Sequence, residues 1–283
     1  MSMSVSSPVE SSTLPSAPFD GVAESYDETF TDTGLGRWLR DLVWAQLESP
    51  PEPGSRALEL GCGTGEDAAW LADRGWQVTA TDASPRMLDV ASAKLQARGL
   101  SERARFVRWD LGEDVPEGVD DGEYALVFSN FGALNCAPDR PALWASLTRL
   151  LRPGGRLVVV FMGPFCPLET LGFGLRGEWR SAVRRWRDDR PATIGEHTVQ
   201  VWFPSVGKVR RELAKDFASM QAVGIGSLVP PSHWSAFVAR HPRLFALARR
   251  LDGLVAPNLG PWIADHYLLS CRRRETMQRE AEA

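Results

Sequence analysis

The sequence predicts an α/β fold in which helices cover both faces of a doubly wound, mostly parallel sheet. Strand-like apolar runs alternate with helical patterns between residues 56 and 161, which is typical of consecutive β-α-β units. The first of these runs leads into a glycine-rich turn, as in many nucleotide-binding α/β proteins. With 283 residues, 43% of them hydrophobic, the chain is long enough to enclose a full core.

The elements follow in a regular order. Residues 1–18 are rich in Ser and Pro and are expected to form a disordered tail. Apolar residues at three- and four-residue spacing predict a helix over 34–43, which the Pro-rich segment 50–54 ends. Ser84 and Pro85 supply the N-cap and first turn of another helix, and a leucine stripe over 143–151 predicts a third. The predicted strands are 56–60, 77–81, 105–109, 125–129 and 156–161.

After residue 162 the regular alternation stops. A helix is predicted over 204–215 and strands over 217–224 and 266–271, while 163–197 has no clean period and 230–262 is helical in pattern. We interpret 163–197 and 230–262 as insertions that contact substrate or form a lid. The expected organisation is one domain over 19–283, with a cofactor-binding half at 34–162.

Charge and cysteine content narrow the function classes. The net charge of −4 gives no global field for nucleic acid or anionic membranes. The four cysteines are far apart and lack metal-ligand spacing, so neither a metal site nor a disulfide framework is expected. No apolar run approaches the roughly 18 residues that span a bilayer, and no signal peptide is apparent, so we expect a cytoplasmic protein.

The strongest functional signal is the turn Gly61-Cys62-Gly63-Thr64-Gly65, which follows a predicted buried strand and opens a helix. Glycines let a ligand lie against the backbone and tolerate positive φ. Free amides at the helix start can also bind an anionic group. A turn of this kind alone fits a tight structural connection equally well.

Two acids strengthen the binding interpretation. Asp82 ends the second predicted strand, where a carboxylate can accept hydrogen bonds from both hydroxyls of a ribose. Asp110 follows the third strand at the same carboxyl edge of the sheet. Either acid could instead serve a helix cap or a loop, but a glycine turn and two acids at three consecutive strand ends favour a ligand site.

The surrounding charges limit the ligand. A nicotinamide fingerprint reads Gly-x-Gly-x-x-Gly, whereas these three glycines are evenly spaced. The turn also lacks the Gly-Lys-Ser/Thr ending of a phosphate-binding loop. Glu59 precedes the turn, where it would repel a pyrophosphate but suit an ammonium group. A ligand with an adenosine end and an amino-acid end fits best.

These features together resemble class I S-adenosylmethionine-dependent methyltransferases, and most nearly the small-molecule branch that includes ubiquinone and menaquinone methyltransferases. The motifs that carry the resemblance are 59–65, 82–88, Asp110 and 151–157, and it covers roughly 20–162. It implies S-adenosylmethionine as the cofactor. It also implies a Rossmann-like seven-stranded sheet whose last strand is antiparallel.

The resemblance implies roles for single residues. Gly61 and Gly63 would lie under the methionine moiety, Glu59 would hold its amino group and Asp82 the ribose hydroxyls. Met87 and Leu111 would pack near the adenine. The other implied cofactor contacts are Tyr26, which would close over the cofactor, Ala83, Asp110 at the adenine amino group, and Ser129 near the sulfonium.

The acceptor is less constrained. A small hydrophobic or aromatic metabolite, methylated at O, N or C as in secondary metabolism, is expected because several of the eleven tryptophans fall in the two insertions. His266 and His233 are candidate bases, although a structural role suits each. The Asn130-Phe131-Gly132 segment lacks the Asn/Asp-Pro-Pro-aromatic tetrad of nucleic-acid amino methyltransferases, which together with the acidic charge argues against nucleic acid.

Three questions stay open at the level of sequence. The segment 176–190 carries six arginines against three acids, so it is either a solvated helix face or a clamp for an acidic acceptor. The protein could bind S-adenosylmethionine only as a scaffold, without methyl transfer. A nicotinamide oxidoreductase is the remaining alternative, and the sequence gives no oligomeric state.

Overall fold

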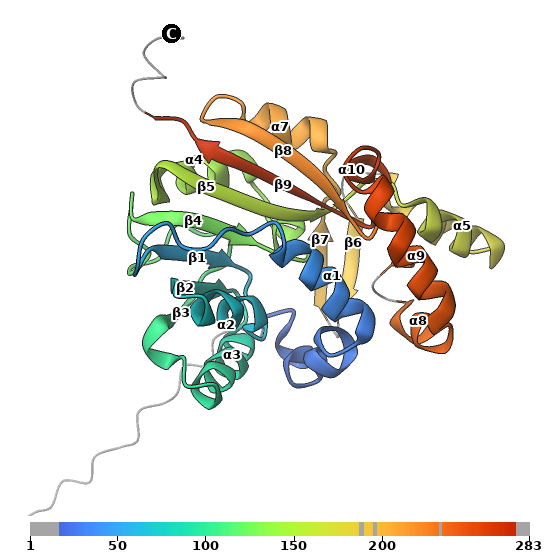
Figure 1. Ribbon diagram of the computed structural model, residues 1–283, viewed down its shortest axis with the longest axis horizontal. Helices are drawn as coiled ribbons and strands as arrows, with labels where there is room; N and C mark the ends of the chain where they lie inside the picture. Colours follow the sequence, from blue (N-terminus) through green and yellow to red (C-terminus); the bar gives the residue numbers. More distant parts are fainter. Residues whose placement is uncertain (1–16, 187–189, 195–196, 232–233, 276–283) are drawn as a thin grey trace, which may run out of the picture.

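A seven-stranded sheet with strand order β3-β2-β1-β4-β5-β9-β8 forms the centre of the molecule (Figure 1). In this computed structural model, residues 17–186, 190–194, 197–231 and 234–275 are described. All neighbouring strands from β3 to β5 are parallel, and β9 runs antiparallel to both β5 and β8. The strands are β1 (Arg56–Leu60), β2 (Gln77–Asp82), β3 (Ala104–Arg108), β4 (Tyr124–Ser129), β5 (Leu151–Met162), β8 (Phe217–Ile225) and β9 (His266–Arg273). The predicted fold class is confirmed.

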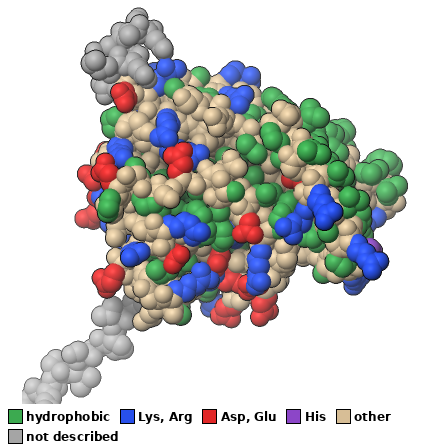
Figure 2. Space-filling view, viewed as in Figure 1, with side chains coloured by type: hydrophobic (Ala, Val, Ile, Leu, Met, Phe, Trp, Pro, Cys, Tyr) green, Lys and Arg blue, Asp and Glu red, His purple; other side chains and the backbone are tan. Residues whose placement is uncertain are grey.

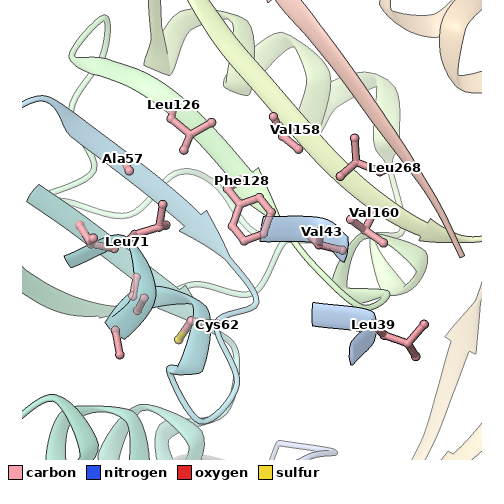
Figure 3. Close-up of a cluster of buried hydrophobic side chains, with 14 of the residues drawn as sticks. Leu39, Val43, Ala57, Cys62, Leu71, Leu126, Phe128, Val158, Val160 and Leu268 are labelled. Atoms are coloured by element: carbon pink, nitrogen blue, oxygen red, sulfur yellow. The ribbon is translucent and has the colours of Figure 1, made fainter. Parts of the chain in front are cut away.

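Helices cover both faces of this sheet. The main ones are α1 (Gly34–Trp44), α2 (Glu66–Asp73), α3 (Pro85–Ala97), α4 (Arg140–Leu150) and α7 (Val206–Leu213). The shorter turns are η1 (Asp20–Ser25), η2 (Asp27–Thr31), η3 (Ser101–Arg103), η4 (Ala133–Cys136) and η5 (Arg184–Trp186). Side chains of α1 and α2 join one buried cluster, part of which Figure 3 shows, while α4 and α7 join a second cluster on the opposite face.

Strand residues divide between these clusters by the alternation of the pleat. In β5, Val158 and Val160 belong to the cluster under α1 and α2, whereas Val159 and Phe161 face α4. In β1, Ala57 belongs to the first cluster and Leu58 and Leu60 to the second. The same alternation turns Glu59 toward the α1 and α2 side, where an ionisable side chain becomes fully buried.

The first insertion has more regular secondary structure than the sequence indicated, and the second is helical as predicted. The first contains α5 (Pro167–Leu175), α6 (Trp179–Ala182) and an antiparallel hairpin of β6 (Arg190–Ile194) and β7 (His197–Val201) that the sequence analysis did not predict. The second contains α8 (Ser235–Arg240), α9 (Pro242–Val255) and α10 (Gly260–Ile263), in agreement with its helical pattern. Figure 2 shows hydrophobic side chains gathered on the side where these helices lie. The exposed leucines of α5 and α9 include Leu175, Leu244, Leu247, Leu251 and Leu254.

Candidate functional site

A cavity of about 710 Å³ lies at the carboxyl edge of the sheet. Its walls come from the segments that follow β1, β2, β3 and β4, from the N-terminal turns, and from the first insertion. Open α/β sheets bind ligands at this edge, since the strands there end in loops that carry polar groups side by side. The volume falls within the range of small-molecule sites.

The three glycines of the turn after β1 serve different purposes. All have positive φ, at +67° for Gly61, +53° for Gly63 and +77° for Gly65. A Cβ on Gly61 would lie 2.2 Å from the Cβ of Ala133, and one on Gly65 would lie 2.6 Å from the Cβ of Ala91. A Cβ on Gly63 would meet no atom within 4 Å, because this residue borders open cavity space. Gly61 and Gly65 are therefore needed for packing, and Gly63 keeps the backbone open to a ligand.

Asp82 holds the turn in place at the end of β2. Its carboxylate accepts hydrogen bonds from the amides of Gly63 and Ser84, each at 2.9 Å. Burial raises the pKa of Asp82, although these two hydrogen bonds lower it again in part. The side chain also lines the cavity, so lone pairs left over from the two bonds can accept from ligand hydroxyls.

Glu59 lies beneath the cavity, one residue before the end of β1. It is 1% exposed, and its Oε2 atom has no hydrogen-bond partner among the described residues. Burial, with the nearby charge of Asp67, raises the pKa of Glu59 well above its ordinary value, against the attraction of Arg40. A buried carboxyl without a partner is costly, and an ammonium group of a bound ligand would relieve this cost. Together with open Gly63 and the acceptor Asp82, these residues fit an adenosyl amino-acid cofactor.

The N-terminal turns, which we call the N-terminal arm (residues 17–31), close over this edge. The carboxylate of Asp20 accepts from the hydroxyl of Ser84 at 2.5 Å. Asp27 accepts from the hydroxyl of Thr64 at 2.6 Å and pairs with Lys94 at 2.7 Å. These contacts position the half-buried Tyr26, which lines the cavity.

A buried ion pair that the sequence analysis missed supports the cavity wall. Arg40 of α1 contacts Asp67 of α2 at 2.5 Å, with both side chains almost fully buried. Asp67 also accepts from the indole of Trp44 at 2.7 Å and the amide of Asn130 at 3.1 Å. Both members of the pair and Asn130 line the cavity. The sequence analysis named Asn130 as part of the segment after β4, but no sequence pattern indicated that Arg40 belongs to the same site.

The part of the cavity away from the glycine turn, here the acceptor half, has an apolar lining. It consists of Phe131, Cys136, Met162, Val201 and Phe203, joined by Arg180, Ser181, Arg184 and Pro191 of the first insertion. Burial raises the pKa of Cys136 to about 11, so its thiol stays protonated at neutral pH. No histidine is among the described residues that line the cavity.

Eight of the ten residues expected to contact a cofactor line the cavity. They are Tyr26, Gly61, Gly63, Asp82, Ala83, Met87, Asp110 and Leu111. Glu59 lies beneath the wall, and Ser129 is fully buried in β4, where its hydroxyl donates to the carbonyl of Leu60 at 2.9 Å. Side chains alternate along an extended chain, and the next residue, Asn130, lines the cavity directly after β4.

Of the two candidate bases, only His266 belongs to the described part of the chain. His266 begins β9 as predicted, but it is 3% exposed and does not line the cavity. Its Nδ1 lies 3.2 Å from Asp265, and its ring packs edge-on against Phe131 with centroids 5.5 Å apart. His233 lies outside the described residues. Across the described ranges, no helix has the length and apolarity for a membrane span, and no cluster of His, Cys, Asp and Glu offers a metal site.

Comparison with known proteins agrees with this geometry. A family described as "Methyltransferase domain" matches residues 57–155. The demethylmenaquinone methyltransferase of Thermus thermophilus is 38% identical over 56% of this chain and 68% of its own length. The corresponding protein of Clavibacter sepedonicus is 37% identical over 56% of this chain, which spans only 63% of that relative. A tRNA 5-carboxymethoxyuridine methyltransferase of Escherichia coli is 29% identical over 50% of this chain and 55% of its own length.

Solved structures share the fold. An S-adenosylmethionine-dependent methyltransferase from Mesorhizobium loti aligns with a TM-score of 0.53 at 22% identity, covering 82% of this chain and 96% of its own. Phosphoethanolamine N-methyltransferase 2 of Haemonchus contortus aligns with a TM-score of 0.59 at 17% identity, over 90% of this chain and 57% of its own. The tRNA methyltransferase among the relatives also means that the expected exclusion of nucleic acid is not supported by the comparisons. The matched domain, the relatives and the fold agree on one conclusion: the chain belongs to the class I S-adenosylmethionine-dependent methyltransferases.

Proposed function

We propose that this protein transfers a methyl group from S-adenosylmethionine to a small molecule with a largely apolar or aromatic body. The observation that carries the proposal is the continuity of one cavity, in which Gly63 and Asp82 line one part and Phe131, Met162 and Phe203 line another. A single cavity of this kind can hold an acceptor atom next to a cofactor in a fixed orientation.

When bound, S-adenosylmethionine supplies a methyl group that is already activated by its positive sulfur. The protein's own residues then bind and orient. Glu59 would neutralise the amino group of the cofactor, and Asp82 would accept hydrogen bonds from its ribose hydroxyls. Gly63, which has no side chain, would let the cofactor lie against the backbone. Tyr26, carried by the N-terminal arm, would cover the cofactor and keep water out.

The cavity lining also bears on the acceptor atom. Cys136 stays protonated, and no histidine lines the described part of the cavity. Acceptors whose nucleophile is already ionised or electron-rich at neutral pH therefore fit best, because they need no strong base. His266 and His233 remain hypotheses as bases: the first packs behind Phe131, and the second lies outside the described residues.

Two measurements test the proposal. S-adenosylmethionine at 100 times its dissociation constant should stabilise the protein by about 2.7 kcal/mol in a thermal-shift assay, while NAD should have no effect. Formation of S-adenosylhomocysteine should then depend on a small aromatic acceptor drawn from a metabolite panel. Cofactor binding without product for any acceptor would favour the scaffold alternative, and product only with bulk tRNA would replace the small molecule by RNA.

A further inference from the structure

The charges that line the cavity are separated by sign, apart from Arg40, which is paired with Asp67. Its acidic lining residues, Glu66, Asp67, Asp82 and Asp110, lie at the carboxyl ends of β1, β2 and β3 or soon after them, on the side of the glycine turn. The described lining of the acceptor half contains no acid, but it contains Arg180 on α6 and Arg184 on η5. A cationic cofactor suits the first group of charges, and the second group suits a ligand of opposite charge.

The segment that carries these arginines is anchored in the protein. Glu169, which is 2% exposed, accepts from Arg184 Nε at 2.8 Å and Nη2 at 3.1 Å, and it also accepts from Arg185 at 2.5 Å. Arg185 in turn reaches Asp265, immediately before β9, at 2.6 Å. The charges of the buried Glu169 and Asp265 thus neutralise those of Arg184 and Arg185. These ion pairs hold η5 against the end of the sheet.

Within the described part of this segment, Arg180 adds a positive charge beyond this balance. Arg180 lines the cavity, is exposed, and has no ion-pair partner among the described residues. Arg184 uses Nε and Nη2 for Glu169, and its guanidinium lies 5.6 Å from the centroid of the Phe173 ring. The remaining N–H donors of its five-donor fork have no hydrogen-bond acceptor among the described residues, and its side chain is 43% exposed. Arg180 and Arg184 belong to the consecutive turns α6 and η5, and both residues line the cavity.

We propose that the methyl acceptor carries an anionic group, a carboxylate or a phosphate, which Arg180 and Arg184 bind while its apolar body lies against Phe131 and Phe203. The inference rests on the proposed function and narrows its substrate class. Arginine forks match planar or tetrahedral anions and form strong charge-assisted hydrogen bonds with them. The two ligands then lie in one cavity with their charged ends on opposite sides, where they do not compete.

The test compares three probes with one apolar body: 2-naphthoate, 2-naphthyl phosphate and the neutral 2-naphthamide. Each is titrated by calorimetry into the full-length protein, with and without S-adenosylhomocysteine. We expect one of the anions to bind at least about tenfold more tightly than the amide, equal to about 1.4 kcal/mol. The tighter anion identifies the group, carboxylate or phosphate.

Variants then assign the preference to its residue. Arg180→Gln should reduce the difference between anion and amide to less than about threefold, and Arg180→Glu should reverse it. Arg176→Gln is the matched control, since Arg176 is an exposed arginine of the same insertion that does not line the cavity. It should keep the wild-type preference.

The outcomes separate this inference from the proposed function. Equal binding of all three probes, including no binding of any, overturns the anion site, as does a preference that survives in both Arg180 variants. Binding of S-adenosylhomocysteine is measured in the same proteins and should not change in Arg180→Gln. Failure of wild type to bind it would contradict the proposed function and leave the probe comparison as an independent result.

Discussion

Substitution of Glu59 by Gln tests how the buried end of the site recognises a cofactor. Burial raises the pKa of Glu59 well above its ordinary value, and its Oε2 has no described partner, so the free protein favours the neutral carboxyl. An ammonium group placed against it would favour the ionised form. We therefore expect binding of S-adenosylmethionine to be accompanied by release of a proton from Glu59.

The magnitude follows from the interaction that is lost. A hydrogen bond to a charged group contributes about 1.5–3 kcal/mol, so Glu59→Gln should weaken cofactor binding by about 10- to 150-fold. In wild type the pKa of Glu59 is raised in the free state and lowered on binding, so affinity should increase as pH rises between these two pKa values. Burial also raises the pKa of Asp82, and the Glu59→Gln variant, which retains Asp82, therefore assigns the effect to Glu59.

Calorimetry in two buffers with different ionisation enthalpies measures both the dissociation constant and the number of protons released. The variant should show a flat pH profile and no proton from this position. Glu123→Gln is the control, because Glu123 is exposed just before β4, at the opposite edge of the sheet. Melting curves of the unliganded proteins exclude unfolding as a cause. Equal affinities of wild type and Glu59→Gln at pH 7 would refute the reasoning.

Three further perturbations have expected outcomes. Asp82→Ala should weaken cofactor binding about tenfold or more, because the Gly63 amide loses its acceptor and so would the ribose hydroxyls of the cofactor. Asp89→Ala is the control, since Asp89 is exposed on α3, and it should leave the affinity unchanged. Equal losses of affinity in the two variants, measured by calorimetry, would contradict a specific role of Asp82. Burial alone would raise the pKa of Asp27, but hydrogen bonds from a lysine and two threonines give it a net lowered pKa. Its contacts therefore stabilise the N-terminal arm at neutral pH and are lost as the carboxylate becomes protonated, so the arm should become protease-sensitive only as pH falls below about 4. Asp27→Asn should show that sensitivity at pH 7, and an equally protected arm would count against the contact. Arg185→Met should reduce the free energy of unfolding by about 3–5 kcal/mol in urea titrations, since the buried Asp265 loses its arginine while Glu169 keeps only Arg184. A loss below about 1 kcal/mol would show that the ion pairs do not anchor the insertion.

Structural features that depend on residues close together in the sequence were predicted well. Strands, helix caps and the glycine turn arise from local periodicity and backbone preferences, and Ser84 caps α3 by accepting from the amide of Met87 at 3.1 Å. Asp82 and Asp110 were placed correctly because parallel strands bring their carboxyl ends to one edge. Eight expected cofactor residues therefore meet at one cavity.

Contacts between distant segments were not predictable in the same way. Arg40 and Asp67 lie 27 residues apart on two helices, and no pattern in either helix indicates that they meet. The hairpin of β6 and β7 had a usable signal, since Gly195-Glu196 separates two runs and a Gly-x pair is typical of two-residue hairpin turns. Composition alone could not decide whether 176–190 is a solvated face or a clamp, because its arginines have different surroundings. Arg185 is buried against two acids, while Arg180 and Arg184 line the cavity.

Three segments that are distant in the sequence, the N-terminal arm, α1 and β9, all contact the ring of Phe131. Phe131 has a φ of +45°, a conformation that costs a non-glycine residue about 1–2 kcal/mol, and it follows β4 directly. Its ring is held by Phe30 of the N-terminal arm at 4.9 Å, by Arg40 at 5.1 Å and by His266 at 5.5 Å. Contacts from three directions can offset the strain and fix the ring where it lines the cavity. His266 is thus placed to position an aromatic wall of the acceptor half, while its Nδ1 lies 3.2 Å from Asp265, immediately before β9.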